Sequence, residues 1–188
     1  GESHPAYATS LHNLALYYDD LGDYNKAIGL YKQALEIRKT TLGESHPTYA
    51  TSLSNLACCY YNIKDYNKSI ELNNQALTIQ ANALGKLHPT YATYLHNAAT
   101  CYDAHGDYAK AVDLYKQALD IRKKTLGEAH PDYAISLYNL ASCYFEAKRF
   151  NKITPIWLLE YKSIKTHTLS QFREMTSFQR QMYWFSNV

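Results

Sequence analysis

Several features that would mark an enzyme, a membrane protein or a nucleic-acid-binding protein are missing from this sequence. The seven glycines are dispersed and form no phosphate-binding loop, and no paired carboxylates or nucleophile–base pair stand at a recognisable spacing. Apolar runs fall well short of the roughly 18–20 residues that cross a bilayer. Lys and Arg form no dense run, and the formal net charge is only +2. We therefore expect no enzymatic activity, cofactor or metal site, and neither a membrane nor a nucleic acid as partner.

What the sequence does contain is a short loop motif that returns at a fixed spacing. The motif Leu-Gly-Glu-Ser-His-Pro stands at residues 42–47 and returns, with small changes, at 84–89 and 126–131. Its last five residues also open the chain at 1–5. A constant spacing of 42 residues is the signature of a repeat array.

Two helical patterns occupy each repeat. In the first copy, Pro5 suits the opening turn of a helix, and apolar residues then recur at the spacing of one helix face. These residues are Leu11, Leu14, Ala15 and Tyr18, which we expect to form the packed side. Gly22 ends this helix, and a second apolar stripe follows over residues 24–42. One such helix pair cannot bury both stripes, whereas stacked copies can, so we predict an all-α solenoid.

The repeats divide the chain into four copies and a tail. We predict repeats at residues 1–42, 43–84, 85–126 and 127–165, and a capping or linker segment at residues 166–188. The fourth repeat is degenerate, because Pro155 falls inside its second helix and should kink or restart it. The chain begins directly before a first helix, without the polar cap that solenoid ends need, so we expect further repeats upstream in the natural protein.

These patterns resemble the tetratricopeptide repeat. Leu14-Ala15-x-x-Tyr18 followed by Gly22-Asp23 carries the resemblance, although the family's usual period is about 34 residues. The 42-residue form is similar to the repeats of kinesin light chains and their bacterial relatives, over about residues 1–164. The resemblance implies a right-handed superhelical solenoid that binds a protein or peptide in a concave groove lined by the first helix of each pair.

The tail carries a second, shorter resemblance. Residues 176–184 are similar to the segment that joins tetratricopeptide arrays to CHAT domains, the caspase-like cysteine peptidase modules of bacteria. This resemblance implies that a peptidase domain follows Val188. The alternative, to which we give more weight, is a helix that covers the last repeat, opened by a capping box at Thr176 and Gln179.

The predicted groove residues lie on the first helix of each pair, away from the packed side. They are His12, Asn13, Leu16 and Asp20; Ser54, Asn55, Cys58 and Asn62; His96, Asn97, Thr100 and Asp103; and Tyr138, Asn139 and Ser142. One asparagine per repeat (residues 13, 55, 97 and 139) could pair with the backbone of an extended peptide, since an amide both donates and accepts. Alternatively, each could bond to the adjacent helix. His12 and His96 are two repeats apart, which suits groove polarity better than a metal site.

Charge suggests what kind of peptide would fit. The predicted groove carries acids such as Asp20 and Asp103 but lacks the Lys and Arg that would hold a free carboxylate, so a partly basic or aromatic peptide fits better. Lys and Arg of the second helices, including Arg38 and Arg122, are expected on a solvated outer face. The histidine before each repeat's proline is expected to serve a turn or packing role.

Cysteine usage and the repeat class together suggest a setting. Cys59, Cys101 and Cys143 share one repeat position, so we expect reduced packing thiols and a cytoplasmic location. The expected function is a protein–protein interaction scaffold, the regulatory or sensor region of a larger bacterial protein. The alternative is an intramolecular arm that restrains a downstream CHAT-type peptidase. A monomer is favoured over association through the first helix or the aromatic tail.

Overall fold

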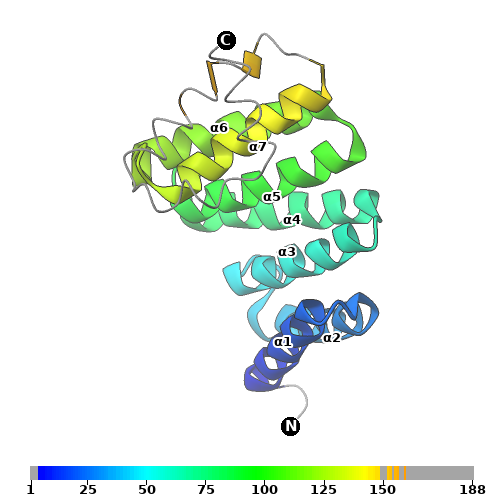
Figure 1. Cartoon of the computed structure of the whole chain (residues 1–188). Helices are drawn as coiled ribbons and strands as arrows, with labels where there is room; N and C mark the ends of the chain where they lie inside the picture. Colours follow the sequence, from blue (N-terminus) through cyan, green and yellow to red (C-terminus); the bar gives the residue numbers. More distant parts are fainter. Residues whose placement is uncertain (1–3, 149–151, 154, 157–158, 160–188) are drawn as a thin grey trace.

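The structure, a computed structural model, describes residues 4–148, 152, 153, 155, 156 and 159. Within these residues it contains only helices and their connections (Figure 1). The helices are α1 (Pro5–Asp20), α2 (Tyr24–Leu42), α3 (Pro47–Asn62), α4 (Tyr66–Leu84), α5 (Pro89–His105), α6 (Tyr108–Leu126) and α7 (Pro131–Glu146).

Each helix packs against the next one along the chain, and α3 also touches the first helices on either side of it, α1 and α5. Figure 1 shows the resulting stack, which runs from α1 and α2 at one end to α6 and α7 at the other. The predicted all-α solenoid of stacked helix pairs is therefore confirmed. We call α1, α3, α5 and α7 the A helices and α2, α4 and α6 the B helices.

Every A helix begins at a histidine–proline pair. The Nδ1 atom of His46 accepts a hydrogen bond of 3.1 Å from the backbone N–H of Thr48, and the histidines at positions 4, 88 and 130 do the same. Proline follows at the first helical position, where its missing N–H costs nothing. The regular loop histidines are therefore helix N-caps, which satisfy donors that the helix leaves free.

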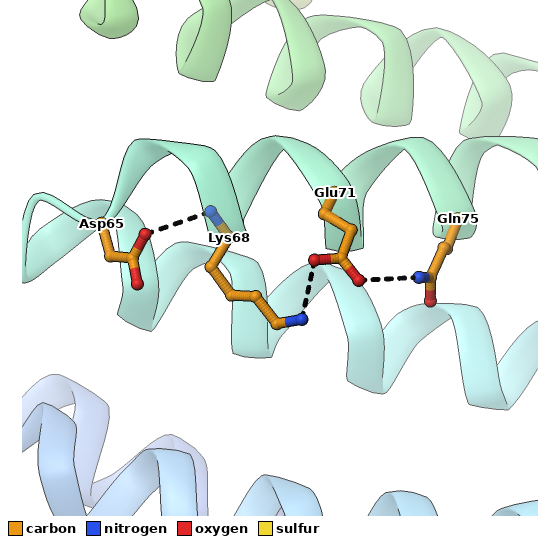
Figure 2. A network of polar contacts seen from close by, with 4 residues as sticks. All are labelled: Asp65, Lys68, Glu71 and Gln75. Carbon is orange, nitrogen blue, oxygen red and sulfur yellow. Dashed lines mark hydrogen bonds and ion pairs between the residues drawn. The ribbon is translucent and has the colours of Figure 1, made fainter.

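Every B helix begins at an aspartate and ends at a glycine. The Asp65 carboxylate accepts a hydrogen bond of 3.1 Å from the backbone N–H of Lys68, and Gly85 ends α4 with a φ of 82°. Figure 2 shows how the polar contacts continue along the outer side of α4, where Lys68 lies 2.7 Å from Glu71 and Gln75 donates to the same carboxylate. These groups are solvent-exposed, so each such pair contributes about 0.3–0.5 kcal/mol at most.

The turn between the A and B helices requires a left-handed backbone. Gly22 and Gly106 adopt φ values of 76° and 90° there. In the second and fourth repeats the same position is a lysine, and Lys64 and Lys148 adopt φ values of 66° and 57°. A residue with a Cβ atom is strained in this region, so these two turns form at a small energetic cost.

The core consists of two clusters. One joins repeats 1 and 2 and the other joins repeats 3 and 4, with Leu77 of α4 packed against both. An alanine at one A-helix position (residues 15, 57, 99 and 141) is fully buried in every repeat, which lets neighbouring helices approach closely. The prediction was wrong for Leu14, which is 45% exposed, because among the described residues no preceding repeat covers it.

Two predictions fall largely outside the described residues. Pro155 and Ile156 are helical, but too few of their neighbours are described to test the predicted kink. The whole tail from residue 166, with its capping box and its resemblance to CHAT linkers, lies outside the described residues.

Candidate peptide-binding face

The predicted groove residues all lie on the A helices, but they differ in their accessibility. Five are exposed: Asn13, Leu16, Asp20, Cys58 and Asn62. Eight are half-buried: Asn55, His96, Asn97, Thr100, Asp103, Tyr138, Asn139 and Ser142. His12 and Ser54 are buried, with exposed fractions of 8% and 5%, so for these two the expectation of an open groove position is wrong.

His12 lies between the first two repeats, inside a polar cluster. Its Nδ1 atom accepts a hydrogen bond of 3.3 Å from Arg38, and its ring meets that of Tyr31 edge-on at 5.2 Å. The side-chain amide of Asn55 lies 3.3 Å from Nε2. A guanidinium can only donate, so Nδ1 must be the acceptor and the proton resides on Nε2. The atom of Asn55 that faces Nε2 is the amide nitrogen, so a hydrogen bond with this tautomer requires the amide to be turned by 180°.

A similar cluster lies between repeats 3 and 4, although there the Nδ1 atom of the histidine is buried and has no hydrogen-bond partner among the described residues. The amide of Asn139 lies 3.0 Å from Nε2 of His96, and the imidazole meets the ring of Tyr115 edge-on at 5.4 Å. Burial, reinforced by the neighbouring arginine, lowers the pKa of His12 to about 4. Burial likewise lowers the pKa of His96 to about 4, and Arg122 adds to the effect. Both imidazoles are thus held neutral in the fold.

The interface between repeats 2 and 3 is built differently. Asn97 donates to Ser54 over 3.3 Å, and Ser54 donates in turn to Asn73 over 3.3 Å. Gln80, at the position that arginine occupies in repeats 1 and 3, donates to the hydroxyl of Tyr94 over 3.2 Å. Interfaces of two kinds therefore alternate along the chain, one with histidine and arginine and the other with serine and glutamine.

The asparagines at residues 55, 97 and 139 consequently bridge neighbouring A helices. Each contacts the residue 43 positions earlier, which is His12, Ser54 or His96. This arrangement supports the second interpretation of the asparagines, that of a bond across to the adjacent helix. Asn13, with no described helix before it, is the exposed member of the set.

Two arginines that complete these clusters were assigned wrongly from sequence. Arg38 and Arg122 are 4% and 5% exposed, not solvated. Arg122 donates to Ser136 and to the backbone carbonyl of Asp132, over 2.6 Å and 3.1 Å. A signal for their burial exists in the sequence, because Arg38 follows Ala34 by four residues and therefore shares the buried stripe of its helix.

Carboxyl groups lie toward the ends of the A helices. Burial raises the pKa of Asp103 and of Asp19 above the ordinary value. The thiol of Cys59 donates to Asp19 over 3.5 Å. A hydrogen bond ties the Asp103 carboxyl group to Cys143, while its buried Oδ1 atom receives none from the described residues.

Neither a metal centre nor a membrane span emerges from the described residues. No group of three or more His, Cys, Asp or Glu side chains in the described part of the chain is arranged to hold a metal ion. None of the helices described has the length and apolarity that crossing a membrane requires.

Stacked helix pairs with polar side chains along one helix of each pair define a helical-repeat solenoid. More particularly, the chain belongs to the tetratricopeptide repeat family. Models described as Tetratricopeptide repeat match residues 48–124 and 106–153, and another matches residues 8–48. Repeats of this family generally mediate protein–protein interaction, and the models that match describe no enzyme.

Solved structures place the chain near kinesin light chains. It is similar to the Podosopora anserina putative kinesin light chain with nearly identical TPR-like repeats, at 29% identity over 93% of this chain and 79% of that one, with a TM-score of 0.77. A variant of that protein with a single substitution gives 30% identity over 89% and 79%, with a TM-score of 0.79. The predicted resemblance to kinesin-light-chain repeats is confirmed.

A further structural match extends beyond this chain's length. BtubC (BKLC) from P. vanneervenii shares the fold at 23% identity and a TM-score of 0.80, over 87% of this chain. The chain spans 65% of the length of that protein. No curated protein matches the chain.

Proposed function

We propose that this chain is a protein-interaction module whose A helices hold an extended peptide of a partner in the concave groove. The observation that carries the proposal is the half-buried carboxyl group of Asp103, whose Oδ1 atom receives no hydrogen bond from the described residues, among half-buried and exposed polar groups of the A helices. Asp20 and Glu146 are further acids on the same helices, and both are exposed. A peptide with lysine, arginine or aromatic side chains offers the donors and cations that these groups lack.

Contact with the ligand falls to the exposed residues rather than to the bridging asparagines. Leu16, Cys58 and Asn62 are free to touch a peptide, whereas Asn55 and Asn97 already bond between helices. We place this module in the cytoplasm, as the regulatory region of a larger bacterial protein. Support for that placement comes from the resemblance to kinesin-light-chain repeats.

A phage-displayed library of random peptides, selected on the intact chain, tests the proposal. We expect basic and aromatic peptides to be enriched, and Asp20→Asn with Asp103→Asn to weaken the binding of a selected peptide about tenfold or more, because charged hydrogen bonds contribute about 1.5–3 kcal/mol each. Asp113→Asn, an exposed acid on the outer side of α6, is the matched control and should leave binding unchanged. The proposal is wrong if the protein with Asp20→Asn and Asp103→Asn binds the selected peptide as tightly as the Asp113→Asn control does.

A second candidate is the intramolecular arm that restrains a downstream CHAT-type peptidase. The similarity of residues 176–184 to the linkers of such proteins favours it. If this candidate is right, the groove variants raise the peptidase activity of the full-length protein, while the Asp113→Asn control leaves it unchanged. Unchanged activity in all variants would leave the peptide-binding module as the function.

A further inference from the structure

The first helix exposes a set of side chains whose counterparts in later repeats are buried, or half-buried in the case of Tyr49. We call Tyr7, Ser10, Leu14 and Tyr17 the docking face of α1. All four are exposed, Leu14 by 45% and Tyr17 by 58%. No helix among the described residues covers them.

Three internal interfaces show what covers this face elsewhere. The counterparts of Leu14 and Tyr17 in α3 are Leu56 and Cys59, which are only 3% and 0% exposed. They are buried because α3 packs against the B helix of the preceding repeat, as α5 and α7 also do. The docking face of α1 thus occupies the position at which the later A helices receive a B helix.

Hydrogen bonds at the internal interfaces indicate which B helix would fit. Arg122 donates to the Ser136 hydroxyl and to the Asp132 carbonyl, and that hydroxyl itself donates to the same carbonyl over 2.9 Å. The equivalent set between repeats 1 and 2 is Arg38, Ser52 and the carbonyl of Thr48.

The docking face of α1 carries the same pair of acceptors. The Ser10 hydroxyl donates to the carbonyl of Ala6 over 3.2 Å, and both residues are exposed. At the position of Ser10, α5 has Tyr94, whose hydroxyl meets Gln80 rather than an arginine. Serine at this position therefore accompanies an arginine on the neighbouring helix, and tyrosine accompanies a glutamine.

Tyr17 adds a steric requirement. The thiol of Cys59, at the corresponding position, lies in one core cluster with Tyr31 of the preceding B helix. A tyrosine in place of that thiol needs room where the ring of Tyr31 stands. In repeat 2 the residue equivalent to Tyr31 is Asn73, which is smaller. Its side-chain nitrogen donates a hydrogen bond of 3.1 Å to the thiol of Cys101.

We propose that the docking face of α1 binds a further helical-hairpin repeat, whose B helix places an arginine on Ser10 and the Ala6 carbonyl and a small residue beside Tyr17. A second copy of the described residues does not supply this helix, because Arg38 and Arg122 are already buried and bonded within their own chain. The partner is therefore a repeat that combines the arginine of repeats 1 and 3 with the small residue of repeat 2.

The test adds such a hairpin to the full chain. A copy of residues 85–126, with Tyr115→Asn in the copy, is fused ahead of Gly1, which recreates the Leu-Gly-Glu-Ser-His-Pro loop at the junction. The control fusion carries Arg122→Gln in the same copy. We expect the arginine-bearing fusion to melt about 2–4 °C above the control, as one added interaction of this size predicts for a chain of this length. Ser10→Ala should abolish the difference.

A second variant covers the case in which the altered copy fails to fold. In this variant, the unaltered copy of residues 85–126 is fused to a chain that carries Tyr17→Cys, so that the tyrosine of the copy meets a thiol, as it does inside the chain. This fusion should have a higher melting temperature than the same fusion with Tyr17 intact. Equal melting of the arginine and glutamine fusions, or an arginine advantage that survives Ser10→Ala, would overturn the proposal. A dimer of the unmodified chain that Leu14→Glu dissociates, seen by light scattering, would overturn it in favour of a second copy.

Discussion

Acid should destabilise this protein through two buried histidines. His12 contacts Arg38 and the ring of Tyr31. His96 contacts the ring of Tyr115 and lies in the field of two opposite charges, those of Arg122 and Asp132. Their pKa values are lowered from 6.5 to about 4 in the folded state. Between pH 6.5 and about 4, the histidines are therefore protonated in the unfolded state but remain largely neutral in the folded state. The stability that depends on neutral histidine is complete above about pH 6.5 and is lost as the pH falls toward 4.

The size of this loss follows from the two pKa values. Full titration corresponds to about 3 kcal/mol for each histidine, and most of this loss appears by about pH 4.5. Stability in repeat arrays is roughly a sum over repeats and their interfaces, so the two histidines, which lie in separate interfaces, should contribute independently. The expected total is therefore on the order of 5 kcal/mol.

Urea unfolding followed by far-UV circular dichroism measures this loss between about pH 7.5 and 4.5. The comparison protein carries His12→Ser and His96→Ser, which copy the serine that repeat 2 has at this position. The variant should start less stable at pH 7.5 but lose much less stability on acidification. Asp19 and Asp103, whose raised pKa values act in the opposite direction, are common to both proteins and cancel in the difference. Parallel pH curves for the two proteins would refute the reasoning.

Three further outcomes are expected. Lys64→Gly, which relieves the left-handed φ of 66°, should raise the free energy of unfolding by about 0.5–1 kcal/mol, and Gly22→Lys should lower it by a similar amount; a loss in Lys64→Gly contradicts the strain argument. His46→Ala should cost about 1 kcal/mol in urea unfolding by removing the N-cap of α3, while His46→Asn should retain most of that stability; equal losses would mean that the cap contributes nothing. A maleimide should modify Cys58 alone in the folded protein, since the other three thiols are buried. The rate of this labelling should rise steeply with pH, because desolvation and neighbouring groups raise the Cys58 pKa to about 11. Mass spectrometry showing equal labelling of Cys59 would contradict this.

Periodicity predicts the fold here because each helix buries a stripe that recurs every 42 residues. The same periodicity cannot say which side chain of the neighbouring repeat a residue meets. Arg38 shares the buried stripe of α2, yet its charge alone suggested solvent, and only contacts with His12 and Ser52 in other helices explain its burial. Leu14 and Leu56 are equivalent in sequence, but one is exposed and the other is covered by the preceding helix pair. Such differences depend on tertiary neighbours that a helical wheel does not contain.

The alternation of two interface types has a consequence for how the gene of such a protein can change. His12, Arg38 and Gly22 reappear as His96, Arg122 and Gly106, which are 84 residues on, whereas the intervening repeat has other side chains at these positions. Deleting one repeat would bring unmatched surfaces together and leave a buried arginine without its serine. Duplication or loss of repeats 2 and 3 together preserves every interface, because arginine then still meets serine and glutamine still meets tyrosine. The unit by which this part of the solenoid can lengthen or shorten is therefore the pair of repeats 2 and 3 rather than the single 42-residue motif.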